Sequence, residues 1–238
     1  MIYFEHWGPE HIKVLIIIAV VMAAVLIPVT LKADEKKTAI VLRCLAVSHL
    51  VLEVIQDWLL VGEQYEWQWM LPLHLCNLGI FINLGAAFSK GKARNILAEM
   101  SLMLIMPGAL GALLFPDWNY RPLLNPITIT IFATHTILQL IPLIMLIKGY
   151  CDIKFRHIIY PILFLVIIVP PIYWIDNKLR ANYLFLRFPV EHSPLSFIYY
   201  NFTPKYYIPG LIILVICVLS VEYLIAIGIR KLISLKRR

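Results

Sequence analysis

Seven long runs of apolar residues make up most of this chain of 238 residues. A helix needs about 20 mostly apolar residues to cross the hydrocarbon core of a bilayer, and each run has close to that length. We expect one helix in each of these ranges: Ile12–Leu31, Ala39–Val61, Leu71–Phe88, Asn95–Phe115, Asn125–Ile147, Ile158–Ile175 and Tyr206–Ile229. The sequence therefore predicts an all-α fold, in which residues 1–238 form a single domain of seven transmembrane helices.

Composition supports the same fold class. Hydrophobic residues make up 61% of the chain and charged residues only 15%, whereas about 25% of a soluble domain is charged. So little polar surface cannot coat a water-soluble globule, which excludes a soluble enzyme, a nucleic-acid-binding domain and a disordered tail. The chain is expected to be a multi-pass protein of a cell membrane.

The basic residues indicate how the helices are oriented. The links after the first, third and fifth runs, together with the C-terminal tail up to Arg237 and Arg238, hold 15 of the 21 Lys and Arg residues. Basic residues accumulate in cytoplasmic loops. We therefore expect the N-terminus outside and the C-terminus in the cytoplasm. The net charge of +7 is explained by this topology, and no nucleic-acid partner is expected.

Polar side chains recur within three of the apolar runs. On the second run, His49, Glu53 and Asp57 are four residues apart, which places them on one face of a helix. The other polar side chains are His74, Cys76 and Asn77 near the start of the third run, and His135 and Gln139 within the fifth. Such groups are costly in hydrocarbon and usually face the interior of a bundle.

The helical rise places these groups at similar depths. Counted from the outer end of each run, Cys76 lies at about 8 Å, Glu53 at about 12 Å and His135 at about 15 Å. A thiol, an imidazole and a carboxylate can act as a nucleophile, a base and an orienting acid. We predict Cys76 as the nucleophile and His135, or else His74, as the base. Glu53 or Asp57 would orient the imidazole.

Further residues are candidates for binding a substrate. Asn77 or Gln139 could donate a hydrogen bond to an oxyanion. The long last outer loop carries Arg180, Asn182 and Tyr183, which could hold a headgroup phosphate. This loop is equally well interpreted as a segment that lies along the membrane surface.

The segment from Leu71 to Asn77, Leu-Pro-Leu-His-Leu-Cys-Asn, resembles the YwaF-like bacterial integral-membrane family. That family is similar to the eukaryotic transmembrane protein 164 acyltransferases. The resemblance continues through Phe115-Pro116-Asp117, Thr134-His135, Lys148-Gly149-Tyr150, Asn182-Tyr183-Leu184-Phe185-Leu186 and Pro204-Lys205-Tyr206-Tyr207.

The resemblance implies a seven-helix lipid acyltransferase with a Cys nucleophile and a His in the membrane. Carried over to this chain, these two residues are Cys76 and His135. It also implies membrane phospholipids as substrates and the bacterial plasma membrane as the location. Neither a cofactor nor a metal ion is expected.

Two other functions stay open at this stage. A transporter or receptor-like module could use the polar residues as an intramembrane path. A zinc-dependent lipid hydrolase would need several His ligands, some of them on the last helix, but the seventh run contains no His. The oligomeric state has no signature in the sequence.

Overall fold

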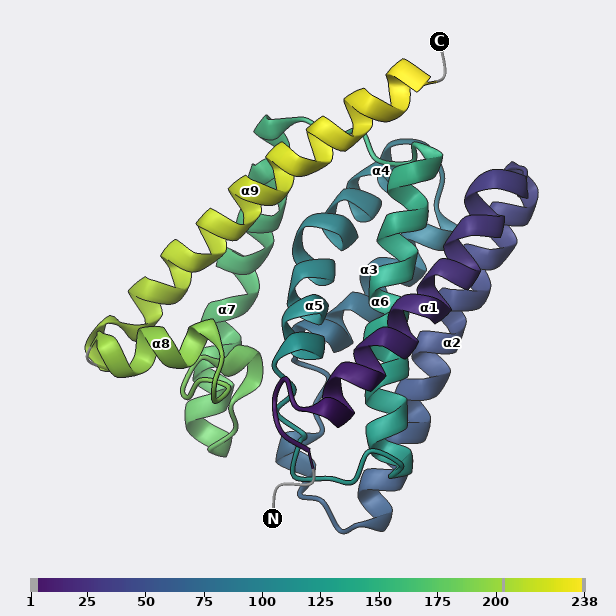
Figure 1. Ribbon diagram of the computed structural model, residues 1–238. Coiled ribbons are helices and arrows are strands. Elements are labelled where there is room, and N and C mark those ends of the chain that lie inside the picture. Colours follow the sequence, from purple (N-terminus) through teal and green to yellow (C-terminus); the bar gives the residue numbers. More distant parts are fainter. Residues whose placement is uncertain (1–3, 203, 237–238) are drawn as a thin grey trace.

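The structure, a computed structural model, describes residues 4–202 and 204–236, and within these residues it is helical without any strand (Figure 1). The α-helices are α1 (Pro9–Lys32), α2 (Glu35–Gly62), α3 (Leu75–Phe88), α4 (Gly91–Met100), α5 (Met106–Leu114), α6 (Pro126–Lys148), α7 (Ile159–Leu179), α8 (Pro194–Asn201) and α9 (Tyr207–Lys236). The predicted all-α membrane fold is confirmed at this level.

Local signals in the sequence explain where the long helices begin and end. Asp34 caps α2 by accepting a hydrogen bond from the backbone N–H of Lys37 at 2.7 Å. Asn125 caps α6 in the same way through Ile127 at 2.8 Å. Gly149 ends α6 with a φ of 80°, in the left-handed region that glycine adopts without strain.

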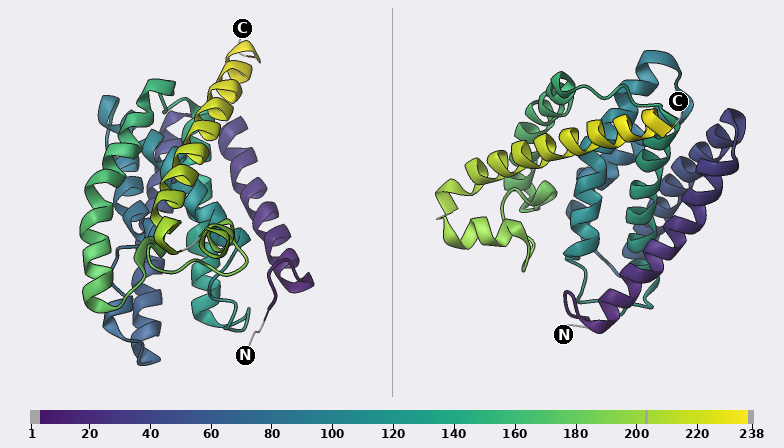
Figure 2. Two further views of the ribbon diagram at one scale, coloured as in Figure 1. Left: turned by 90° about the vertical axis from the view of Figure 1, so that its left-hand side faces the viewer. Right: turned by 45° about the horizontal axis from the view of Figure 1, so that its top comes forward.

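Helix α6 forms the centre of the molecule. Most of its residues are buried, whereas only three residues of α1 and three of α7 are. Helices α1, α2 and α5 pack around α6, while α7, α8 and α9 stand to one side (Figures 1 and 2). The outer helices expose apolar side chains such as Ile17 on α1 and Val166 on α7, which suits contact with lipid.

Six of the seven predicted runs form helical segments long enough to cross a membrane. One of them, Gly91–Leu114, joins α4 to α5 through a π-helical segment at Ser101–Ile105. The remaining run forms α3, which has 14 residues and is about 21 Å long. Because the hydrocarbon core is about 30 Å thick, α3 alone does not cross it.

The prediction that α3 begins at Leu71 is wrong. Residues 71–74 form a turn, in which the backbone N–H of Leu73 donates to the carbonyl oxygen of Leu71 at 2.7 Å. The N–H of Leu71 donates to the hydroxyl of Tyr183 at 2.9 Å. These bonds hold the segment in a turn, so the helix starts at Leu75 and His74 becomes its N-cap residue.

Glycine allows α3 to pack closely against the π-helical segment. A Cβ atom built on Gly79 would lie 2.7 Å from Cγ2 of Ile105, which is closer than real side chains approach. Gly79 therefore leaves room for the side chain of Ile105 against α3. This contact fixes α3 and the residues at its start.

The links after α1, α3 and α6 lie together at the end of the bundle that carries the C-terminus (Figure 1). Lys148 donates to the carbonyl oxygen of Ala33 at 2.7 Å, and the guanidinium of Arg94 lies 4.0 Å from the ring centroid of Tyr150. The described basic links thus share one side of the molecule, as predicted. Arg237 and Arg238 lie outside the described residues.

Candidate active site

The polar face of α2 points into the bundle. His49 is fully buried, and Glu53 and Asp57 are half-buried. Val54, between these two acidic residues in the sequence, is 61% exposed. The spacing of four residues therefore places the three polar side chains on the interior side of the helix, as predicted.

Cys76 takes part in a chain of polar contacts between α3 and α2. Its thiol donates to Oδ1 of Asn77 over a distance of 3.7 Å. The side-chain amide of Asn77 in turn donates to Oε1 of Glu53. Asn77 is 9% exposed, so this link between a thiol, an amide and a carboxylate is shielded from solvent.

The start of α3 presents backbone N–H groups beside this thiol. Leu78 makes the first intrahelical bond, to the carbonyl oxygen of His74 at 3.0 Å, and the His74 side chain makes no capping bond. The N–H groups of the first turn, those of Leu75, Cys76 and Asn77, have no acceptor within the helix. Such groups can stabilise a negatively charged oxygen.

His135 is held in one orientation by its own helix. Its Nδ1 lies 2.8 Å from the carbonyl oxygen of Ile131. Because a carbonyl can only accept a hydrogen bond, Nδ1 carries the proton and the neutral ring has its lone pair on Nε2. The ring of Trp118 lies 5.4 Å from the imidazole. In this tautomer, Nε2 of His135 is free to accept a proton.

The loop between α5 and α6 has one residue near Cys76 and another against His135. Within this loop, Asp117 interacts electrostatically with the Cys76 thiol, while the neighbouring Trp118 contacts the ring of His135. His135 also interacts electrostatically with His74, two residues before Cys76. The structure therefore brings the predicted nucleophile, both candidate bases and Glu53 into one region.

Tyr183 fixes the turn that precedes α3. Its hydroxyl donates to the carbonyl oxygen of Gln68 at 2.6 Å and accepts the N–H of Leu71 at 2.9 Å. Burial raises the pKa of Tyr183 to about 12, so the hydroxyl keeps its proton at neutral pH. The ring of His74 lies 5.0 Å from that of Tyr183. Tyr183 therefore positions His74 and the start of α3.

Replacing Tyr183 with phenylalanine should lower the stability of the protein. Tyr183 is 1% exposed, and the change leaves the N–H of Leu71 and the carbonyl of Gln68 without their partner. We expect a loss of about 1–3 kcal/mol in the free energy of unfolding, measured by thermal or denaturant unfolding in detergent. Tyr173→Phe, at an exposed position on α7, is the matched control. Equal stability of the two variants would contradict this role.

The other predicted residues of the last loop differ in their contacts. Asn182 is occupied within the loop, where its Oδ1 accepts the N–H groups of Arg187 and Phe188 at 3.0 Å. Arg180 ends α7 with a φ of 56°. Asn182 thus orders the loop, while Arg180 extends from the helix end that precedes it.

Gln139 binds α5, since its amide donates to the carbonyl oxygen of Met106 at 2.8 Å. Asp57 lies on the interior face of α2, one turn beyond Glu53.

Within the part of the chain that the structure describes, no three His, Cys, Asp or Glu side chains are grouped as metal ligands. The zinc-dependent alternative therefore has no ligand set there.

The sequence did not single out Trp118 as a contact of His135 or Asn77 as the link to Glu53. The motif Phe115-Pro116-Asp117 directly precedes Trp118 in the sequence but does not indicate its contact with His135. Asn77 was recognised as polar, but its partner on α2 could not be predicted, because it depends on how α2 and α3 pack.

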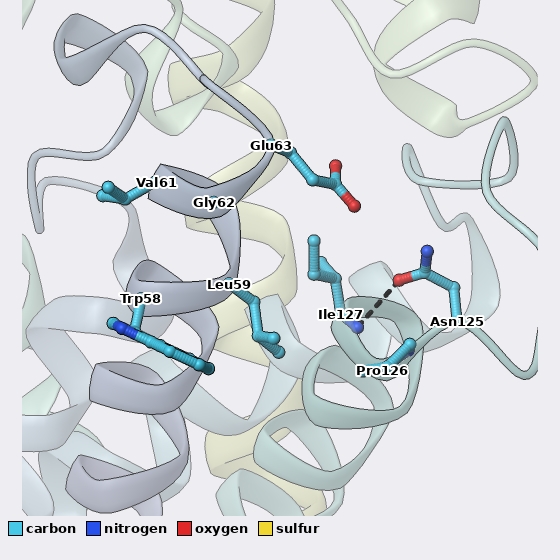
Figure 3. Close-up of a pocket in the computed structure, with 8 residues that line it drawn as sticks. All are labelled: Trp58, Leu59, Val61, Gly62, Glu63, Asn125, Pro126 and Ile127. Atoms are coloured by element: carbon cyan, nitrogen blue, oxygen red, sulfur yellow. Dashed lines mark hydrogen bonds between the residues drawn. The ribbon is translucent and has the colours of Figure 1, made fainter.

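A groove of about 400 Å³ lies where α2 ends and α6 begins (Figure 3). Its walls are mostly apolar, with Trp58 and Leu59 on one side and Pro126 and Ile127 on the other (Figure 3). The carboxylate of Glu63 stands at its rim and pairs with Arg121. The groove is thus apolar along its walls and polar at its rim.

Comparison with known proteins identifies the family. The model of the TMEM164 family matches residues 6–223. The chain belongs to the TMEM164 family. The match to TMEM164 includes every predicted site residue, from Glu53 to Tyr183. No curated protein and no solved structure matches the chain.

Proposed function

We propose that this TMEM164-family protein is a membrane-embedded lipid acyltransferase, in which Cys76 is the nucleophile and His135 the base. Membrane phospholipids are its substrates, and no cofactor takes part. The protein has seven membrane segments, of which α3 is the short one. Its N-terminus lies outside and its C-terminus in the cytoplasm, and the membrane is a bacterial plasma membrane. The site then lies in the half of the bundle nearer the outer surface.

In the first step, Nε2 of His135 takes the proton of the Cys76 thiol. The thiolate attacks the carbonyl carbon of a phospholipid ester, and a carbon–sulfur bond forms while the ester carbon–oxygen bond breaks. The proton on His135 passes to the departing alkoxide. The products are a lysophospholipid and an acyl thioester on Cys76.

In the second step, an acceptor hydroxyl gives its proton to His135 and attacks the thioester. The acyl chain moves to the acceptor oxygen, and the proton returns to the sulfur of Cys76. In both steps the carbonyl oxygen becomes negatively charged. The N–H groups at the start of α3, which have no acceptor within the helix, are suited to stabilise it.

The remaining candidate residues have supporting roles in this proposal. Glu53 holds Asn77, and Asn77 orients the thiol of Cys76. Asp57 and Gln139 lie toward the substrate from α2 and α6. In the last loop, Arg180 binds the headgroup phosphate, while Asn182 and Tyr183 shape the loop. The groove between α2 and α6 is suited to an acyl chain.

One observation carries the proposal: Cys76, at the start of α3, is linked through Asn77 to Glu53 on α2. A cysteine that served only as a small apolar residue would have no need of this polar chain. His135, with its lone pair on Nε2, supplies the base that the thiol requires.

The experiment is an assay in liposomes that contain purified protein. A phospholipid with isotope-labelled acyl chains serves as donor and an unlabelled lysophospholipid as acceptor, and lipid mass spectrometry follows the label. We expect labelled acyl chains in the acceptor. Labelled free fatty acid alone would indicate a hydrolase, and label that stays in the donor would contradict the proposal.

A further inference from the structure

A polar pocket of about 230 Å³ lies at the opposite end of the bundle from Cys76. Helix α4 and the start of α7 form its two sides, together with the segment between α6 and α7. Its charged and titratable side chains are Lys92, Glu99, Asp152, Lys154, Arg156 and His157. None of these residues has a part in the proposed acyl transfer.

Glu99 and His157 form a pair that lines this pocket. Glu99 on α4 is 2% exposed, and both of its carboxylate oxygens accept from Nδ1 of His157, at 2.9 and 3.2 Å. The ring of Tyr160 lies 5.1 Å from that of His157. These contacts hold α4 and the start of α7 at a fixed separation, so the pocket is preformed.

The charge of the pocket favours an anion. Asp152 is already paired with Lys154 and with Arg230, and hydrogen bonding to Lys154 lowers the pKa of Asp152. Lys92 and Arg156 have no ion-pair partner among residues 4–202 and 204–236. The lining side chains carry three Lys or Arg cations against two carboxylates, so their net charge is positive even with His157 neutral.

Apolar side chains beside the pocket place it against lipid. Phe155 and Ile159, one position before and three positions after Arg156 in the sequence, are 48% and 45% exposed. The pocket lies at the ends of two helical segments long enough to cross the membrane, Gly91–Leu114 and Phe155–Leu179. A ligand there would have its charged group among Lys92 and Arg156 and its apolar part along Phe155 and Ile159.

We propose that this pocket binds the phosphate group of a membrane phospholipid from the leaflet at the C-terminal end of the bundle. Lys and Arg side chains form charge-assisted hydrogen bonds to phosphate oxygens, and basic pockets between transmembrane helices bind anionic headgroups. Lys92 and Arg156 bind the phosphate. The Glu99–His157 pair keeps these two cations far enough apart for the phosphate group to fit between them. The bound lipid joins α4 to α7.

Native mass spectrometry of the purified full chain in detergent tests the site, with phosphatidylglycerol as the probe. The double variant Lys92→Gln and Arg156→Gln should bind the lipid at least about tenfold more weakly than the wild type. The matched control is Lys36→Gln with Lys37→Gln, two exposed cations at the same end of the bundle. This control should bind phosphatidylglycerol as the wild type does.

Unchanged lipid binding by the Lys92/Arg156 double variant would overturn the proposal. Arg156→Lys, which keeps the charge, should keep most of the binding, and its complete loss would also count against the site. Inorganic phosphate separates the two possible sources of the anion. If the ligand is a lipid, inorganic phosphate should compete only weakly with phosphatidylglycerol for the pocket. Tight binding of phosphate without any retained phosphatidylglycerol would overturn the assignment to a lipid.

Discussion

Replacing Cys76 with alanine should reduce acyl transfer by roughly 10³-fold or more, because no other thiol lies at the start of α3 to form the thioester. The lost group is small and half-buried, so the protein should still fold. The rate of label transfer in liposomes measures the effect, and thermal unfolding in detergent reports on the fold. Cys217→Ala, at an exposed position of α9, should keep the wild-type rate.

Full activity of the Cys76→Ala variant would rule out the thioester mechanism. A loss of activity together with a loss of folded protein would point to a packing role for Cys76. Cys76→Ser tests this packing role, since serine keeps the size and a hydrogen-bond donor but is a poorer nucleophile. It should fold as the wild type does and still lose most of its activity.

Replacing His135 with alanine should lower the rate by about 10²–10⁴-fold, the usual contribution of a general base. In the proposed mechanism, the imidazole accepts the Cys76 proton and later donates it to the leaving group. Imidazole added to the assay should restore part of the activity, which a purely structural role would not allow. His192→Asn is the control, because His192 is exposed and has a φ of 57°, a conformation that asparagine tolerates. Unchanged activity of His135→Ala would exclude this residue as the base.

Much of the fold follows from local signals in the sequence. The long apolar runs predicted the helices, and capping residues such as Asp34 and Asn125 begin two of them. The start of α3 could not be predicted, because a hydrogen bond from Leu71 to Tyr183, 112 positions later, fixes the turn before it. The π-helical segment Ser101–Ile105 also has no local signal in the sequence.

The candidate site could likewise be predicted only in part from the sequence. Residues four apart had to share a face of α2, so the interior position of His49 and Glu53 could be predicted from spacing alone. The contacts of Asn77 with Glu53 and of Trp118 with His135 join different helices and loops. They depend on how the elements pack, which hydropathy and spacing do not determine.

In the proposed mechanism, Cys76 carries the acyl chain during transfer. Intact-protein mass spectrometry after incubation with phospholipid, without acceptor, tests it most directly. We expect an added acyl mass on Cys76, located by peptide mapping, released by neutral hydroxylamine, and absent from the Cys76→Ala variant. Acyl transfer by a wild-type protein that never carries this adduct, or an adduct that persists in Cys76→Ala, would contradict it.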